Sequence, residues 1–294
     1  MPVAPPLCLL SFHAHPDDES SKGAGTVARY HAEGVRTVLV CATGGEEGDI
    51  LNPAMDREDV KANIGEVRKA ELESAAEIIG YDEVVMLGYR DSGMPDSEAN
   101  ANPESFAQAP FDEAVGRLVA IIRRTRPQVI LSYGDERDWY PHPDHLRVHE
   151  LTQPAVDRAA DPGWYPEAGE PWQVAKIYHS IWSRKRFEAM HEKYLELGLE
   201  SPFTDARWRD RPSQDDKITT HIDITGFAGV RFDALLAHAT QIDPDSPFWF
   251  GLPRHIAEEV HPFDDFVRET SLVDAPTPED DLFAGVRTQV GSST

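Results

Sequence analysis

The chain is poor in cysteine, in basic residues and in long hydrophobic runs. Its 294 residues include only two cysteines, Cys8 and Cys41, both in apolar runs, so we expect free buried thiols and a reducing, cytoplasmic location. The 28 basic residues face 52 acidic ones, and the formal net charge is -24. Such a surface repels phosphates and anionic lipids, so we expect neither nucleic acid nor a membrane as a partner. No apolar run reaches the roughly 18 residues of a transmembrane helix.

Patterns of buried strands and amphipathic helices alternate along the first half of the chain. This alternation is typical of an α/β fold, here a Rossmann-like, mostly parallel sheet with helices on both faces. Polar loops follow the predicted strands and would gather at their carboxyl ends, where open α/β sheets bind ligands. The predicted strands are 7–13, 35–42, 83–87 and 128–132, and the predicted helices are 21–31, 60–79, 111–124 and 145–159.

After residue 160 the amino-acid composition changes, and Pro, Trp and Gly become frequent. One more strand is predicted at 176–182. We assign 1–160 to the core and 161–294 to a smaller C-terminal region, packed over the open end of the sheet within a single unit. The tail beyond residue 270 is rich in Pro, Asp and Thr, is expected to be irregular, and is given no role. Further helices are predicted at 187–197 and 227–240.

The densest group of potential metal ligands follows the first predicted strand. It reads His13-Ala14-His15-Pro16-Asp17-Asp18-Glu19. Neutral imidazole and carboxylate are suitable zinc ligands, and a catalytic zinc needs three of them plus water. His15 and Asp18 are three residues apart, so they share a face if they lie in a first helical turn.

A second group, His142-Pro143-Asp144-His145, follows the predicted strand 128–132. Both groups would therefore lie at the same edge of one sheet, which favours a site of two histidines and one carboxylate. The spacing leaves open which three of His15, Asp18, His142 and His145 bind, and it does not exclude His13. Iron(II) would accept the same ligands as zinc.

These residue types favour metal-dependent hydrolysis of an amide. Zinc lowers the pKa of a bound water to about 7, and a base must take the proton of that water. Asp17 lies beside Asp18 but faces elsewhere, which suits a base. His142, as an imidazolium oriented by Asp144, and the hydroxyl of Tyr140 could stabilise the oxyanion.

Six segments resemble the LmbE / PIG-L family of zinc N-deacetylases and amidases. Together they cover most of positions 10–245 and imply the same Rossmann-like fold. They are HAHPDDESSKGA, TGGEEGDILNPAMD, RDSGM at 90–94, YPHPDH, AGEPW at 168–172 and LLAHATQID at 235–243.

The resemblance implies a role for each matched residue. From the residues alone, Arg68 is interpreted as a surface charge and Asp91 as a turn residue. In the family, the residues that match His15, Asp18 and His145 bind one zinc ion, and the match to Asp17 is the general base. The match to His142 stabilises the transition state and is the general acid, with Asp144 behind it, and the match to Tyr140 assists at the oxyanion. The matches to Arg68 and Asp91 hold the sugar–inositol part of the substrate, and Lys22 matches a lysine associated with substrate preference.

Lys22 and the NPAMD sequence favour the amidase branch of this family. The resemblance then implies hydrolysis of a small pseudodisaccharide thiol conjugate, a mycothiol S-conjugate, in thiol-based detoxification. The products would be a mercapturic acid, which is an S-substituted N-acetylcysteine, and glucosaminyl-inositol. The alternatives are deacetylation of N-acetylglucosaminyl-inositol in mycothiol biosynthesis, and a non-catalytic metal- or sugar-binding protein. The sequence is also compatible with a homo-oligomer.

Overall fold

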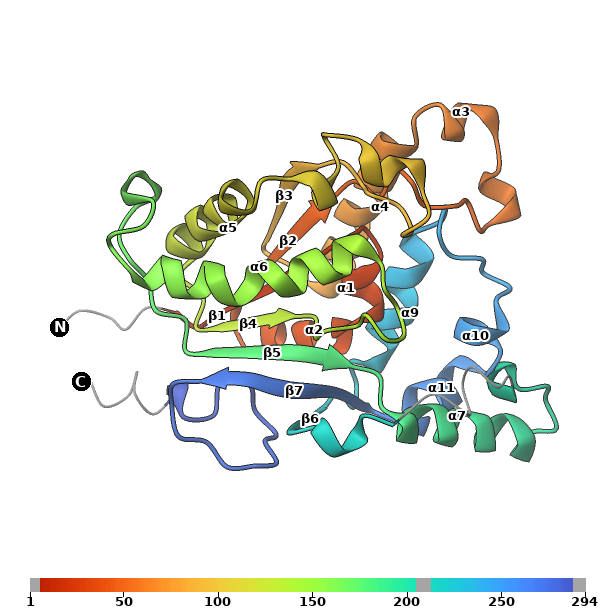
Figure 1. Ribbon diagram of the computed structural model, residues 1–294. Coiled ribbons are helices and arrows are strands. Elements are labelled where there is room, and N and C mark those ends of the chain that lie inside the picture. Colours follow the sequence, from red (N-terminus) through yellow and green to blue (C-terminus); the bar gives the residue numbers. More distant parts are fainter. Residues whose placement is uncertain (1–5, 205–212, 288–294) are drawn as a thin grey trace.

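A seven-stranded sheet with the order β3-β2-β1-β4-β5-β7-β6 forms the centre of the computed structural model, which describes residues 6–204 and 213–287 (Figure 1). The first five strands are parallel, and β7 runs antiparallel to both of its neighbours. The predicted α/β class with a mostly parallel sheet is therefore confirmed. The strands are β1 (Cys8–His13), β2 (Arg36–Thr43), β3 (Glu83–Tyr89), β4 (Val129–Ser132), β5 (Lys176–Ile181), β6 (Thr220–Asp223) and β7 (Phe263–Ser271).

Helices cover both faces of the sheet. Helices α5 and α6 pack on one face, and α2, α4 and α9 pack on the other (Figure 1). The central strand β1 is buried along its whole length, which explains its uninterrupted apolar sequence. The helices are α1 (Asp18–Ser21), α2 (Ala24–Ala32), α3 (Glu58–Lys61), α4 (Ile64–Ile79), α5 (Phe111–Thr125), α6 (Pro143–Ala160), α7 (Arg184–Glu196), α9 (Ala228–Ala237), α10 (Pro247–Phe250) and α11 (Arg254–Val260).

Two predicted helices differ from the observed ones. The helix predicted at 60–79 is split into α3 and α4, which are separated by Ala62 and Asn63. The helix predicted at 21–31 is preceded by the short helix α1, and Gly23, with φ of 86°, separates α1 from α2. This break leaves α1 as a separate short helix directly after β1.

Strands β6 and β7 were not predicted, because β6 is only four residues long and the sequence of β7 is rich in charged residues. In β7, Asp264 and Asp265 are both 5% exposed. Asp264 accepts a hydrogen bond from Arg231, and Asp265 contacts the imidazoles of His221 and His261. Buried acids are tolerated when they are paired in this way. The C-terminal region therefore extends the sheet with three strands, β5, β7 and β6.

The tail beyond residue 270 also contributes to the fold, although no role was predicted for it. Leu282 and Phe283 are fully buried against β5 and α2 side chains. Glu279 Oε1 lies 2.5 Å from Lys176 Nζ, and both side chains are fully buried. Residues 288–294 of this tail lie outside the described part of the chain.

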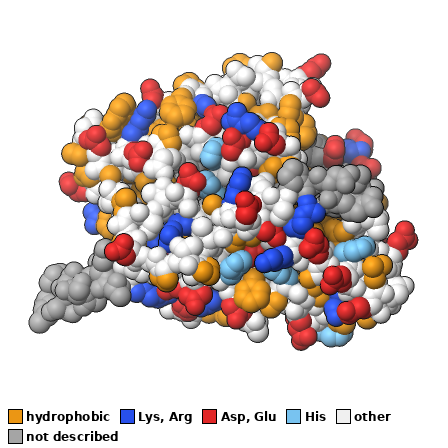
Figure 2. Space-filling view, turned by 60° about the horizontal axis from the view of Figure 1, so that its bottom comes forward, with side chains coloured by type: hydrophobic (Ala, Val, Ile, Leu, Met, Phe, Trp, Pro, Cys, Tyr) orange, Lys and Arg blue, Asp and Glu red, His pale blue; other side chains and the backbone are white. Residues whose placement is uncertain are grey.

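The surface and the thiols agree with the composition. On the face shown in Figure 2, basic side chains are scattered among acidic ones and form no continuous basic area. Within residues 6–204 and 213–287, no helix has the length and hydropathy needed to cross a membrane. Cys8 and Cys41 are buried and free, as predicted.

Replacing Glu279 with leucine should lower the free energy of unfolding by about 3–5 kcal/mol, because the Lys176 ammonium then stays buried without its carboxylate. Equilibrium unfolding in urea measures the loss. Glu196→Leu is the matched control, because its carboxylate is 63% exposed and pairs with Lys193 at the surface. Such exposed pairs contribute about 0–1 kcal/mol. Equal losses for the two variants would contradict the importance of the buried pair.

Candidate metal centre and active site

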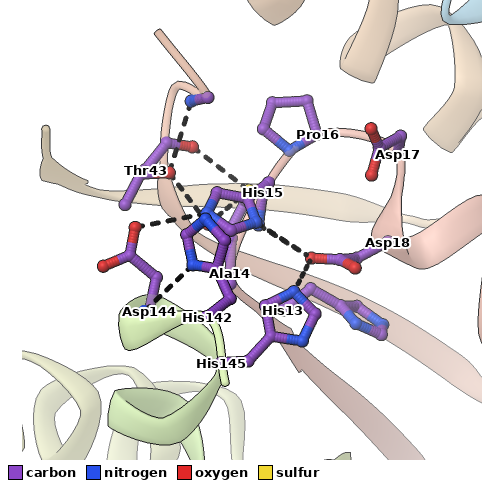
Figure 3. Close-up of polar contacts among 12 residues, drawn as sticks. His13, Ala14, His15, Pro16, Asp17, Asp18, Thr43, His142, Asp144 and His145 are labelled. Carbon is purple, nitrogen blue, oxygen red and sulfur yellow. Dashed lines mark hydrogen bonds and ion pairs between the residues drawn. The ribbon is translucent and has the colours of Figure 1, made fainter. Parts of the chain in front are cut away.

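A sharp turn after β1 places the first group of ligands at the carboxyl edge of the sheet. Asp17, the last residue before α1, has φ of 108°, a region that non-glycine residues rarely adopt. Its backbone N–H donates to Glu19 Oε2 at 3.0 Å, and the Pro16 carbonyl accepts from Arg68 Nη2 at 2.6 Å. The turn directs the Asp18 carboxylate at two histidines and leaves Asp17 apart from them (Figure 3).

Asp18, His15 and His145 converge on one point (Figure 3). Asp18 Oδ2 lies 3.5 Å from His15 Nδ1 and 3.4 Å from His145 Nε2. The three side chains are buried, and one ligand atom of each lies within 4.8 Å of the others. Two imidazoles and one carboxylate at these separations have the chemistry of a catalytic zinc site with open positions. The residues present therefore fit a divalent metal ion.

A carboxylate supports each of the two histidines on the side away from this point. His15 Nε2 lies 3.2 Å from Asp144 Oδ2, and His145 Nδ1 lies 2.9 Å from Glu136 Oε2. Such contacts fix the orientation and the tautomer of a metal-binding imidazole. Burial alone lowers the pKa of His15, but hydrogen bonds to the surrounding carboxylates outweigh it, and the pKa is raised.

Lys22 supports the third ligand. Its Nζ donates to Asp18 Oδ1 at 2.6 Å, which leaves Oδ2 to face the histidines. Burial raises the pKa of Asp18, but the charges of Lys22 and His145 outweigh this effect and hold the pKa well below its usual value. The ammonium of Lys22 thus contacts Asp18, one of the three candidate metal ligands. Lys22 is not one of the described residues that line the cleft leading to these ligands.

Arg68 is buried, at 2% exposed, and is not the surface charge that the residues alone indicated. Its guanidinium donates to Asp17 Oδ2 at 3.2 Å and to the carbonyl of Gly45. Desolvation raises the pKa of Asp17, and the charge of Arg68 opposes this rise. The Asp17 carboxylate is 31% exposed, so one fixed oxygen acceptor faces the cleft.

His142 and Asp144 interact differently from the prediction. His142 precedes α6, and its Nδ1 accepts the backbone N–H of Asp144 at 3.2 Å. The Asp144 carboxylate instead contacts His15 and accepts hydrogen bonds from the amide and hydroxyl of Ser92. Burial, together with the charges of His15 and His145, lowers the pKa of His142 to about 3. The imidazole is therefore neutral in this arrangement, with its proton on Nε2.

An open cleft of about 250 Å³ leads to the ligands. Tyr140 lies at its side, with its ring centroid 4.8 Å from that of His145. Asp91 lies at its base, 3.5 Å from His15 Nε2, and accepts the Gly93 N–H at 2.8 Å. The lining residues are His15, Asp17, Asp18, Glu47, Gly48, Asp49, Leu51, Arg68, Asp91, Gly93, Met94, Tyr140, His142, His145 and Gln241.

Several supporting residues were missed by the sequence reasoning. Glu136 lies in the same loop as the second motif, six residues before His142, whereas Ser92 and His238 come from segments far from both motifs. His238 Nε2 lies 2.6 Å from Glu19 Oε1, and both side chains are fully buried. The signal in the sequence was that Glu19, Ser92 and His238 lie in three segments that resemble the same family.

Comparison with known proteins agrees with this geometry. Residues 10–156 match the family described as PIG-L: GlcNAc-PI de-N-acetylase. The chain is 46% identical over 289 residues to the mycothiol S-conjugate amidase of Streptomyces coelicolor, covering 96% of this chain and 98% of that protein. The chain belongs to the PIG-L (LmbE-like) family.

A second relative in the PIG-L family carries a different name. It is a 1D-myo-inositol 2-acetamido-2-deoxy-alpha-D-glucopyranoside deacetylase of Streptomyces avermitilis, 40% identical over 293 residues, with 95% of this chain and 97% of that protein covered. Amidase and deacetylase both hydrolyse an amide bond, so this chain is an amide hydrolase.

Solved structures show the same PIG-L fold. The N,N'-diacetylchitobiose deacetylase of Pyrococcus horikoshii has a TM-score of 0.60 at 18% identity, covering 89% of this chain and 83% of that one. The 4-carboxy-2-hydroxymuconate hydratase of Pseudomonas putida has a TM-score of 0.58 at 19% identity, covering 92% and 99%. Because a hydratase shares the fold, the fold alone does not decide the reaction.

Replacing Glu136 with alanine should weaken zinc binding by about 10–100-fold, because His145 loses the carboxylate that orients its ring. Titration of the metal-free protein with Zn²⁺ against a competing chelator measures the affinity. Asp135→Ala is the matched control, since this neighbouring carboxylate is exposed and pairs with Arg137. Unchanged affinity in the Glu136 variant would contradict the supporting role.

Proposed function

We propose that this protein is a zinc-dependent amidase that hydrolyses mycothiol S-conjugates to a mercapturic acid and glucosaminyl-inositol. The observation that carries the proposal is the 46% identity, over almost the full length of both chains, to an enzyme with that name. The site supports it with a metal-ligand set, a fixed carboxylate and hydrogen-bond donors in one cleft. The free thiols of Cys8 and Cys41 agree with a place in the reducing cytoplasm.

His15, Asp18 and His145 would hold the metal ion. When bound there, one divalent cation supplies Lewis-acid assistance to the amide carbonyl and lowers the pKa of water. We favour zinc, and iron(II) would accept the same ligands.

Asp17 is positioned to take the proton of the attacking water. Its carboxylate shares the cleft with the three ligands but belongs to none of the contacts among them. Arg68 fixes one of its oxygens, and the raised pKa moves the carboxyl toward the range useful for proton transfer. Asp17 then carries the proton that the leaving amine needs.

His142 and Tyr140 are positioned to stabilise the oxyanion of the tetrahedral intermediate. The Nε2–H of the neutral His142 imidazole is a donor in the cleft, and the Tyr140 hydroxyl is a second one. The role of general acid, which the resemblance implies for His142, would require a second proton on the ring and loss of the bond from the Asp144 N–H. We therefore assign oxyanion stabilisation to His142 and return of the proton to Asp17.

Polar residues of the cleft would bind the sugar–inositol part of the substrate. Arg68 and Asp91 both line the cleft, as a substrate-binding role requires. Lys22 would act on the substrate indirectly, through the Asp18 carboxylate that it holds.

Deacetylation of N-acetylglucosaminyl-inositol is the second candidate function. The 40% identity to a deacetylase over nearly the whole chain favours it, and the two reactions would use the same groups. They differ in the acyl group on the amide nitrogen, which is acetyl in one substrate and S-substituted N-acetylcysteinyl in the other.

Asp17→Ala should retain the metal and lower kcat by about 10²–10⁴-fold, because it removes the proton acceptor alone. His145→Ala should lose both metal and turnover, because it removes a ligand. Metal content by elemental analysis and kcat on a fluorescent mycothiol S-conjugate measure the two properties, and the exposed Asp135→Ala variant is the control. Wild-type turnover in Asp17→Ala would show that another group is the base.

A paired assay should separate the two candidate functions. We expect the zinc-loaded protein to have a higher kcat/KM for the S-conjugate than for N-acetylglucosaminyl-inositol, and a chelator to abolish both activities. A preference for the acetylated sugar would identify the deacetylase. Absence of any chelator-sensitive hydrolysis of either compound would overturn both proposals.

A further inference from the structure

Large apolar side chains are exposed inside the cleft, which is otherwise polar. Leu51 is 60% exposed, Met94 is 49% exposed and Tyr140 is 38% exposed. They come from three different loops, which follow β2, β3 and β4, and all three line the cleft. The remaining lining is dominated by charged and polar groups. The cleft is therefore amphipathic, and its apolar side chains are accessible to a ligand that binds in it.

The backbones of Leu51 and Met94 are held by hydrogen bonds. The Leu51 N–H donates to the Thr240 carbonyl at 2.9 Å, in the segment after α9. The Met94 carbonyl accepts the Ser97 N–H at 2.8 Å and the side-chain amide of Asn100 at 2.5 Å. These bonds hold the backbone from which the two apolar side chains extend into solvent, although burying such side chains would stabilise the fold. Exposed apolar groups in a binding cleft point to an apolar part of the ligand.

We propose that Leu51 and Met94 bind the S-linked substituent of the conjugate and set a preference for apolar substituents. This inference rests on the proposed amidase function. The conjugate has two chemically different parts. One is a polyol, and the other is the substituent on sulfur, which comes from the electrophile that reacted with the thiol. Arg68 and Asp91 suit the polyol, and the two apolar side chains suit an alkyl or aryl group. A flat protein–protein surface does not explain them, because they face a cleft that contains the metal ligands.

A series of S-alkyl mycothiol conjugates, from S-methyl to S-hexyl, tests the proposal. With the wild-type enzyme, kcat/KM should rise by about twofold for each added methylene, about half the logarithmic effect of full burial. In the double variant Leu51→Ser/Met94→Ser the rise should nearly vanish, and the loss should lie mainly in KM. Tyr140 is left unchanged, because it is a candidate catalytic residue.

Leu272→Ser is the matched control, since Leu272 is also exposed, at 57%, but lies just beyond β7 and outside the cleft. It should keep the wild-type dependence on chain length. Thermal unfolding checks that the variants fold, and substitutions of exposed side chains usually change stability little. A wild-type dependence in the double variant would overturn the assignment of Leu51 and Met94 and leave the amidase function intact. Failure of the wild-type enzyme to hydrolyse any conjugate would overturn both.

Discussion

The site depends on the strained turn at Asp17. A non-glycine residue at φ of 108° is costly, and such strain persists only where surrounding contacts over-determine it. Here the N–H of the Pro16–Asp17 peptide donates to Glu19, and the carbonyl of the same peptide accepts from Arg68. The turn separates two neighbouring carboxylates in space. One can bind a metal, and the other can act on a proton.

Three distant parts of the chain hold this turn in place. Arg68 comes from α4, and His238, which contacts Glu19, follows α9. His145 comes from the first turn of α6. Because α4 and α9 also pack on the same face of the sheet, the hydrophobic core and the site constrain each other. Functional groups carried by helices and strands that are packed in this way are positioned more accurately than groups on free loops.

The sequence predicts the core of this structure well, because its central strands are buried on both faces and have uninterrupted apolar sequences. It predicts the two motifs because both follow such strands. It fails at β7, where Asp264 and Asp265 are buried against partners from other elements, so that local polarity hides a buried strand. The sequence also fails to single out Glu136, because the loop contains several acids. Only the folded structure shows that Glu136 is the one that contacts His145.

Charge is the remaining constraint on the site. The carboxylates of Asp18, Asp91 and Asp144 surround the single imidazole of His15, and Lys22 is a permanent cation in direct contact with Asp18. Buried charges are tolerated only when they are compensated, and removing this many carboxylates from water is expensive without further positive charge. A divalent cation between Asp18 and the two histidines would supply that charge at the point where the ligand atoms converge. The buried carboxylates that suit a metal ion therefore destabilise the fold when no metal is bound. Metal binding is thus coupled to the stability of this edge of the sheet.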